Sequence, residues 1–389
     1  MSRLEQLIQQ YCPDGVEYQS LSHICHSIKT GKLNANAMVE GGQYPFFTCS
    51  DKVFTIDKYS FDTEALLVAG NGYLGNVKYY KGKFDAYQRT YVLSDFIEDV
   101  DIMYVYYAMQ NSFRDYALKS QKDGSVPYIT IGIFDSYCIP IPPLPVQEEI
   151  VRILDAFTEL HTELHTELHK RKQQYEYYRD TLLSFEGRED VQWMKLGDVA
   201  SQWYRGAGIK RDEVSEEGMP CIRYGEIHTT YNIWFNECVS HTDENRQPAK
   251  KYADHGDILF AITSEDIPFI GNSVAYLGKE RIMVGGDIVV MKHNQDPKYM
   301  SYVLSTSNAV KQKGKGKVKS KVVHTSVPSL QEIVVPIPSL DEQEKIATIL
   351  DRFNHLINDL SQGLPAEIEA RRKQYEYYRD QLLTFKQKA

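Results

Sequence analysis

The chain is poor in cysteine and has no long apolar segment. Its 389 residues include six cysteines and no CxxC pair. The cysteines are Cys12, Cys25, Cys49, Cys138, Cys221 and Cys238. This spacing excludes a disulfide framework and a thiolate zinc site, so we expect free thiols, mostly within the core. No run of about 18 apolar residues occurs, and the first residues lack an apolar signal core, which argues against a membrane span and against secretion. We therefore expect a cytoplasmic protein.

Several catalytic motifs are also missing. No GxxxxGK[ST] and no HExxH occurs, and no serine or cysteine nucleophile stands in a recognisable setting. Pro142-Pro143 is followed by Leu144, where the tetrad of an amino-methylating enzyme would have an aromatic residue. We expect that the chain alone catalyses no reaction.

One segment does match a nucleotide-binding motif. Gly70 to Gly75 reads GNGYLG and follows a predicted strand. A dinucleotide site needs a helix next, but Asn76 to Phe84 (NVKYYKGKF) is typical of a strand and a turn. A nucleotide-dependent enzyme stays open as an alternative. A glycine turn that lets the backbone approach a partner is favoured.

The charge balance is acidic, with 53 Asp and Glu against 44 Lys and Arg and a net charge of −9. This argues against a protein that coats nucleic acid through bulk charge, although a local basic surface can exist within an acidic total. From Thr306 to Val327 there are six lysines and no acid, namely Lys311, Lys313, Lys315, Lys317, Lys319 and Lys321. A basic loop of this kind suits phosphate contact, and a solvated loop is the alternative.

Other residues have the side-chain types that read base edges. Arginine pairs with guanine, and asparagine or glutamine with adenine, in the major groove. The DNA-binding candidates of this kind are Arg205, Lys210, Arg211, Arg223 and Tyr224 in one half of the chain, and Asn71, Tyr73, Asn76, Tyr87, Gln88 and Arg89 in the other.

The most informative feature is an internal repeat. QYEYYRD occurs at Gln174–Asp180 and again at Gln374–Asp380. Upstream, IPIPPLPVQEEIVRILDAF resembles VPIPSLDEQEKIATILDRF. Weaker echoes join Val16-Glu17-Tyr18 to Val191-Gln192-Trp193, Gly31 to Gly206, Pro45 to Pro220, and Gly75-Asn76 to Gly271-Asn272. The chain therefore consists of two copies of one plan.

Each copy combines a variable module with a helical segment. Short β-rich runs between Gly, Asn and Asp turns predict mixed α/β modules at residues 1–145 and 187–340. Apolar residues spaced by three and four predict helical spacers at 146–186 and 341–389, the first helix running from Gln147 to Phe185. Gly363-Leu364-Pro365 should end one helix and start another. We expect an α+β fold with an internal pseudo-twofold repeat, in which two long antiparallel helices pack as a coiled pair.

Residues Thr158–His169 are TELH written three times. They place the spacer-helix leucines Leu160, Leu164 and Leu168 along one side of the helix. The histidines beside them have a metal-chelating spacing, but a solvated stripe explains them equally, so we predict no metal site. Each unit would add about 6 Å and a net rotation near 40°, close to one or two base pairs of B-DNA at about 3.4 Å and 35° each. The repeat could therefore act as a ruler.

The chain resembles the specificity subunit of type I restriction-modification systems, the HsdS family. Three features carry this resemblance: the paired proline-rich segments that precede the helices, the two QYEYYRDxLLxF helix ends and the TELH repeat. The resemblance implies a non-catalytic subunit whose two target recognition domains read the halves of a bipartite, asymmetric DNA site. It implies double-stranded DNA, two methyltransferase subunits and two restriction subunits as partners. S-adenosylmethionine, ATP and Mg²⁺ would belong to those partners, and this chain would bind no cofactor. A coiled-coil scaffold that does not bind DNA is the other alternative.

Overall fold

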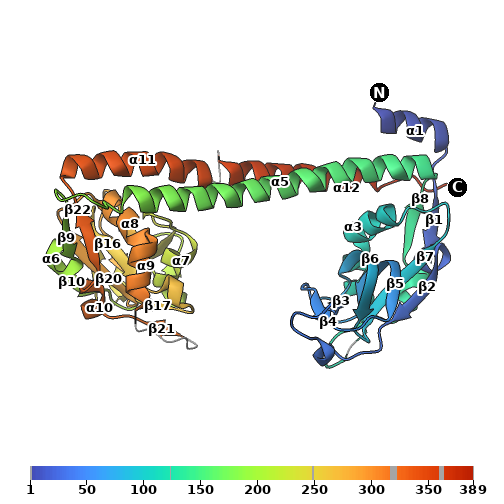
Figure 1. The fold of residues 1–389 in the computed structure, drawn as a ribbon, viewed down its shortest axis with the longest axis horizontal. Coiled ribbons are helices and arrows are strands. Elements are labelled where there is room, and N and C mark those ends of the chain that lie inside the picture. The colour runs from blue at the N-terminus through green and yellow to red at the C-terminus, as the bar shows by residue number, and fades with distance from the viewer. Residues whose placement is uncertain (1, 123, 248, 316–321, 359–362, 389) are drawn as a thin grey trace. The chain divides into compact units, whose positions relative to one another are not determined.

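The computed structural model describes residues 2–122, 124–247, 249–315, 322–358 and 363–388. The chain divides into two compact units, the first formed by Met1–His165 with Glu367–Ala389 and the second by Thr166–Ala366. The long helix α5 (Leu144–Leu182) belongs to both units, because the division falls inside it. Each unit has its own sheets (Figure 1). Each also has its own hydrophobic core.

The first unit is built on a six-stranded sheet with the strand order β2-β7-β5-β6-β3-β4. Its strands are β2 (Cys25–Thr30), β3 (Tyr44–Phe47), β4 (Phe54–Ile56), β5 (Phe61–Ala69), β6 (Val77–Ala86) and β7 (Thr90–Phe96), and a separate pair joins β1 (Glu17–Ser20) to β8 (Cys138–Ile141). Leu66 and Val68 of β5 enter the main core, whereas Ala65 and Leu67 enter a smaller cluster. Alternate residues of a strand point to opposite faces, so β5 is an unbroken apolar run because both of its faces are buried.

Helix α3 (Ile102–Ser120) packs on this sheet and supplies much of the core. It begins after Asp101, whose carboxylate accepts hydrogen bonds from the backbone N–H groups of Met103 and Tyr104 at 2.7 and 3.3 Å. Aspartate is a preferred residue at this position because it satisfies free N–H groups of the first turn. The unit's other helices are α1 (Arg3–Tyr11), α2 (Leu21–Ile24), α4 (Ile133–Ser136), the 3-10 turn η1 (Ala35–Ala37) and, from the end of the chain, α12 (Leu364–Leu382).

The second unit contains two five-stranded sheets. The first has the order β10-β20-β16-β18-β13 and the second β11-β14-β12-β19-β15. The strands are β10 (Ala200–Arg205), β11 (Val214–Ser215), β12 (Met219–Ile222), β13 (Trp234–Phe235), β14 (Ser240–Thr242), β15 (Tyr252–Ala253), β16 (Ile258–Ala261), β18 (Ser273–Tyr276), β19 (Ile282–Val284) and β20 (Ile288–His293), with the short pairs β17 (Thr263–Ser264) to β21 (Val323–His324) and β9 (Gln192–Lys195) to β22 (Val334–Ile337). Strand β16 repeats the arrangement of β5, since its residues enter two clusters alternately.

Two consecutive helices of the second unit take the place of α3. Helix α8 (Pro297–Ser305) begins after Asp296, which caps the N–H of Tyr299 at 2.7 Å. Thr306 then adopts an extended backbone and caps the next helix, α9 (Ser307–Gly314). The remaining helices are α6 (Leu196–Val199), α7 (Tyr224–Thr229), α10 (Val327–Gln331) and α11 (Leu340–Asn358), with 3-10 turns η2 (Arg211–Glu213), η3 (Glu244–Arg246) and η4 (Ile267–Phe269).

The first long helix lies a few residues upstream of its predicted position. It begins at Leu144 rather than Gln147 and ends at Leu182 rather than Phe185. Pro145 therefore lies in the first turn, where its missing N–H breaks no helical hydrogen bond. The helix ends before Gly187 because Phe185 already has a left-handed backbone with φ of 46°. With 39 residues, α5 is about 58 Å long at 1.5 Å per residue.

The second helical segment is divided as predicted. Helix α11 ends at Asn358, and α12 begins at Leu364 with Pro365 in its first turn. The Gly-Leu-Pro sequence therefore marks the start of a new helix.

The internal repeat extends to individual hydrogen bonds. Tyrosines of α3 and α8 donate to the strand before the long helix and to a carboxylate within it. These bonds are Tyr104 to Pro140 O and Tyr299 to Pro336 O, both at 2.9 Å, and Tyr107 to Asp155 Oδ1 and Tyr302 to Asp351 Oδ1, both at 2.6 Å. Each module is thus fastened to its helix in the same way.

The weaker sequence echoes also correspond to equivalent structure. Val16-Glu17-Tyr18 leads into β1 and Val191-Gln192-Trp193 into β9. The two Gly-Asn turns make the same pair of backbone bonds: Ala69 N to Asn76 O and Gly75 N to Ala69 O in one, and Ala261 N to Asn272 O and Gly271 N to Ala261 O in the other.

Within each unit the long helices lie side by side in opposite directions (Figure 1). In the first unit Phe157 of α5 stacks on Tyr378 of α12, with ring centroids 5.7 Å apart. In the second unit Tyr178 of α5 stacks on Phe353 of α11 at 6.1 Å. The predicted α+β fold with a pseudo-twofold repeat and paired antiparallel helices is confirmed.

Two further expectations concern cysteines and membranes. All six cysteines are free thiols, and Cys12, Cys25, Cys49 and Cys221 are buried, as expected of core residues. Over the described ranges, no helix combines the length and the apolar character that crossing a lipid bilayer requires.

Candidate nucleic-acid interface

The second unit has an open cavity of about 800 Å³ beside the ends of several strands. It brings together four of the predicted DNA-binding residues, Arg205, Arg211, Arg223 and Tyr224. They come from the end of β10, from η2 and from the start of α7. Lys210 lies beside them but points to solvent, with its Nζ 3.7 Å from Glu213.

Glycine backbone forms the floor of this cavity. A Cβ atom on Gly206 would lie 2.2 Å from the carbonyl oxygen of Gly285, and a Cβ on Gly285 would lie 3.1 Å from that of Ile222. The three segments can approach so closely only because these positions have no side chain. The cavity therefore combines arginines with closely packed glycine backbone.

The cavity also contains carboxylates. Arg205 donates from Nε to the carbonyl oxygen of Gly286 and from Nη2 to Asp287 Oδ1 at 2.7 Å. Arg223 donates from Nη2 to Glu226 Oε1 at 3.4 Å. Two of the three arginines are thus already paired with an acid.

The candidates of the first unit form a second cluster. The turn between β5 and β6 carries Asn71 and Tyr73, and the turn between β6 and β7 carries Gln88 and Arg89. The two turns are joined by a hydrogen bond from Gly70 N to Arg89 O at 2.8 Å. Tyr73, Gln88 and Arg89 are exposed, and Asn71, Asn76 and Tyr87 are half-buried. The structure therefore gathers these residues at one edge of the sheet.

Sequence reasoning missed two members of this cluster. The guanidinium of Arg114, on α3, lies 4.3 Å from the centre of the Tyr73 ring. The ring of Tyr128 lies 5.5 Å from the guanidinium of Arg89. No local pattern could have found them, because both contacts join segments that are distant in the sequence.

The predicted lysine loop needs one correction. Lys311 and Lys315 are exposed, but Lys313 is buried and donates from Nζ to the carbonyl oxygen of Leu304 at 2.7 Å. Burial lowers the pKa of Lys313 to about 7. The prediction of a phosphate contact is wrong for Lys313, because its amine faces the protein interior. Lys317, Lys319 and Lys321 lie outside the described residues.

Comparison with known proteins identifies the family of the chain. The family model of the type I restriction modification DNA specificity domain matches residues 13–172 and again 188–370. The chain belongs to this family. It is a DNA specificity subunit of the type I restriction-modification class, as the sequence resemblance predicted.

Curated relatives extend over most of this specificity subunit. The specificity subunit of EcoR124I/EcoR124II from Escherichia coli is 32% identical over 299 residues, which cover 73% of this chain and 71% of the relative. A putative specificity subunit from Haemophilus influenzae is 27% identical over 386 residues, covering 95% and 96% of the two chains.

Solved structures share the fold. The S subunit of a type I system from M. genitalium matches with a TM-score of 0.54 at 16% identity, covering 95% of this chain and 96% of that one. A chain from a structure that describes the assembly and conformational transition of the type I system matches with a TM-score of 0.62 at 15% identity, covering 95% and 98%.

The specificity subunit is the non-catalytic member of its class. The GNGYLG segment fits this conclusion, because it joins β5 to β6, which pair antiparallel. A strand-turn-strand connection has no helix whose N-terminus could hold a pyrophosphate. The alternative of a nucleotide-dependent enzyme is not favoured.

The TELH repeat lies within unbroken helix. Leu160, Leu164 and Leu168 are half-buried on α5. The Nε2 atoms of His161 and His165 are 3.3 Å apart on the exposed side. No group of three or more metal-binding side chains occurs within the residues that the structure describes.

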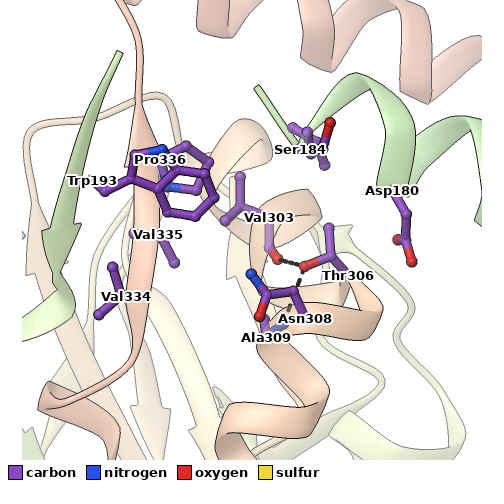
Figure 2. A pocket seen from close by; sticks show the side chains of 11 residues that line it. Asp180, Ser184, Trp193, Val303, Thr306, Asn308, Ala309, Val334, Val335 and Pro336 are labelled. Atoms are coloured by element: carbon purple, nitrogen blue, oxygen red, sulfur yellow. Dashed lines mark hydrogen bonds between the residues drawn. The ribbon is translucent and has the colours of Figure 1, made fainter. Parts of the chain in front are cut away.

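A smaller pocket of about 150 Å³ lies inside the second unit, between the end of α5 and the start of α9. Figure 2 shows Trp193 beside Pro336 on one side and Asp180 across from them. The carboxylate of Asp180 accepts a hydrogen bond from the backbone N–H of Ser307 at 3.2 Å. The pocket therefore marks the joint between helix and module.

Proposed function

We propose that this chain reads a bipartite, asymmetric DNA target, one half through each module. The module at residues 1–145 would read one element and the module at 187–340 the other. The observation that supports this most directly is the pair of residue clusters, each on turns at the end of a central sheet. Each cluster offers arginine and tyrosine side chains, which can donate hydrogen bonds to base edges and phosphates.

The two clusters differ in their residues although the modules share one plan. The first offers Asn71, Gln88 and Arg89, and the second offers Arg211 and Arg223. Amides favour adenine and arginine favours guanine, so different half-sites are expected. This difference supports an asymmetric target.

We further propose that the chain assembles with two methyltransferase subunits and two restriction subunits in the cytoplasm. The partners would bind S-adenosylmethionine, ATP and Mg²⁺, and this chain would bind none of them. This part of the proposal derives from the family resemblance and from the absence of catalytic motifs in the sequence.

A duplicated aromatic surface supports two copies of one partner. The first patch is Tyr177, Tyr178 and Phe353, and the second is Tyr377, Tyr378 and Phe157. Tyr177 is 68% exposed and Tyr377 is 63% exposed. Exposed aromatic rings at repeated positions are typical of protein interfaces. Two equivalent patches on one chain would accept two identical subunits.

The decisive experiment is methylation-sensitive sequencing of host DNA with and without this gene. We expect the loss of one bipartite motif containing methylated adenine when the gene is deleted. An unchanged methylome, together with a purified chain that binds partners but no specific DNA, would instead support the scaffold alternative.

A further inference from the structure

We infer that Arg223 reads a guanine in the half-site of the second module, and that Glu226 is the positioning residue that holds it in the reading orientation. This inference rests on the proposed function, since it names one base contact of the same interface. It goes further by assigning one side chain to one type of base pair.

Arg223 is held in place differently from the other arginines of the cavity. It precedes the first residue of α7, and its backbone N–H donates to Glu226 Oε2 at 3.1 Å. Its Nη2 reaches the other oxygen of the same carboxylate at 3.4 Å. The side chain is 32% exposed, so one part of the guanidinium is fixed while another part lines the cavity.

Glu226 is itself held rigidly. Its side chain is 9% exposed, and Oε1 accepts a hydrogen bond from the hydroxyl of Ser240 at 2.6 Å. A buried carboxylate is costly unless it is paired, so Glu226 constrains Arg223 strongly. An arginine oriented in advance loses less conformational entropy when it forms a two-pronged contact.

Arg223 also lacks a full set of partners. Across the described chain, its Nε is shielded from solvent and has no hydrogen-bond partner. Arg205, in contrast, already donates to Gly286 and Asp287. Because Nε is shielded, a base would be contacted by the terminal nitrogens of the guanidinium, on a side chain that is 32% exposed and lines the cavity.

The local charges favour a base edge over a phosphate as that acceptor. The cavity contains the carboxylates of Glu226 and Asp287, which neutralise Arg223 and Arg205 and would repel a phosphate. A guanine edge is neutral and offers O6 and N7 to the arginine fork. The Arg223 and Glu226 pair therefore suits a G·C base pair.

The first module has a different residue at the equivalent position. Tyr87 N donates to Phe47 O at 2.8 Å, and Gly285 N donates to Ile222 O at 2.9 Å. Both bonds link the end of a strand to its parallel neighbour, so Phe47 corresponds to Ile222. The next residue is Thr48 in the first module and Arg223 in the second. The guanine contact should thus belong to one half-site alone.

The test uses the complex of this chain with its methyltransferase partner in a host that lacks other such systems. Motifs are determined by methylation-sensitive sequencing for the wild type, R223K and R223A. Lysine keeps the charge but loses the fork, so R223K should lower the preference for guanine at one position by roughly 5- to 150-fold. The other half-site and the gap should stay the same. Arg246, whose side chain is 80% exposed and pairs with Asp243, provides the control R246A, which should leave the motif unchanged.

A second measurement needs only the wild-type complex for its main result. Each guanine of the second half-site is replaced in turn by 7-deazaguanine, which lacks the N7 acceptor, and the binding constant of the wild-type complex is measured. One replacement should weaken binding about 5- to 10-fold, and the same replacement should have less than about 2-fold effect on R223A. E226Q should weaken this dependence, because the positioning carboxylate is removed.

The outcomes are distinguishable. If the wild-type complex produces no bipartite motif, the proposed function fails and the inference fails with it. If the wild type produces one but R223K leaves it unchanged, or if no guanine replacement matters, only the assignment of Arg223 is overturned. A uniform loss of binding on every sequence would make Arg223 a phosphate contact and would also overturn it.

Discussion

Gln147 in the first unit and Gln343 in the second make two equivalent hydrogen bonds through their side-chain amides. Gln147 Oε1 accepts from Asp101 N at 2.9 Å, and Gln343 Oε1 accepts from Asp296 N at 3.0 Å. Each Nε2 donates to the carbonyl oxygen of a proline five residues upstream, at 2.7 and 2.9 Å. Both side chains are fully buried. Each glutamine joins the start of a module helix to the start of a long helix.

Replacing either glutamine by leucine should destabilise the unit that contains it. The substitution leaves one backbone N–H and two acceptors without their partner, at a cost of about 2–4 kcal/mol in the free energy of unfolding. Urea denaturation of Q147L and Q343L measures this cost. Gln381 is exposed on α12, so Q381L should change stability by less than about 0.5 kcal/mol. Equal stabilities for all three variants would show that these bonds do not secure the joint.

The repeat could be predicted from the sequence because identical segments need identical surroundings. QYEYYRD and the proline-rich entries identified the two long helical segments, and Gly363-Leu364-Pro365 identified the start of α12. The weaker similarity between Gly75-Asn76 and Gly271-Asn272 also identified two equivalent turns, since both make the same backbone hydrogen bonds. Local patterns succeed where local geometry determines the structure.

Other features depend on contacts between distant segments and could not be read from the sequence. The alternation of lysine with other residues from Lys311 onward gives no sign that Lys313 packs against Gly271, where its Cδ lies 3.4 Å from the position of a Cβ. The placement of Arg114 over Tyr73 requires knowing that α3 crosses the β5–β6 turn.

The lysines between Lys311 and Lys321, apart from the buried Lys313, should contribute to DNA binding without affecting sequence preference. Alanine at Lys311, Lys315, Lys317, Lys319 and Lys321, with Lys313 retained, should weaken binding of all sequences. The slope of log K against log salt should fall by about 0.9 for each phosphate that the chain no longer neutralises. A control variant carries alanine at Lys170, Lys172 and Lys373 on the long helices. An unchanged slope in the loop variant would remove these lysines from the interface.

Lys313 should make the stability of the second unit depend on pH. Its folded pKa of about 7 lies below its ordinary value of 10.5, because burial disfavours the charged amine. Between these two pH values the unfolded chain binds more protons than the folded chain, so stability rises as pH increases from 7 toward 10. Below pH 7 the amine is charged in both the folded and the unfolded chain, so the full cost of burying its charge remains. K313M should therefore be more stable than the wild type at pH 7, by a few kcal/mol, and less dependent on pH.

Urea denaturation at pH 7, 8 and 9 provides the measurement. Lys311 lies on the same helix but is exposed, so K311M should follow the wild-type pH dependence. Subtracting the two curves removes contributions from other groups that titrate in this range. Parallel curves for K313M and K311M would show that Lys313 keeps its charge in the folded protein.

The length of α5 should set the gap between the half-sites. Removing Thr162–His165 deletes one TELH unit and shortens the helix by four residues, or about 6 Å with a net rotation near 40°. This change is close to one or two base pairs of B-DNA, at about 3.4 Å and 35° each. The methylated motif should therefore have a gap shorter by one or two base pairs, with both half-sites unchanged. The control H161A/H165A keeps the helix length while removing the paired imidazoles, and its gap should equal that of the wild type. Altered half-sites in the deletion variant would refute the ruler, since a pure change of length leaves both reading clusters intact.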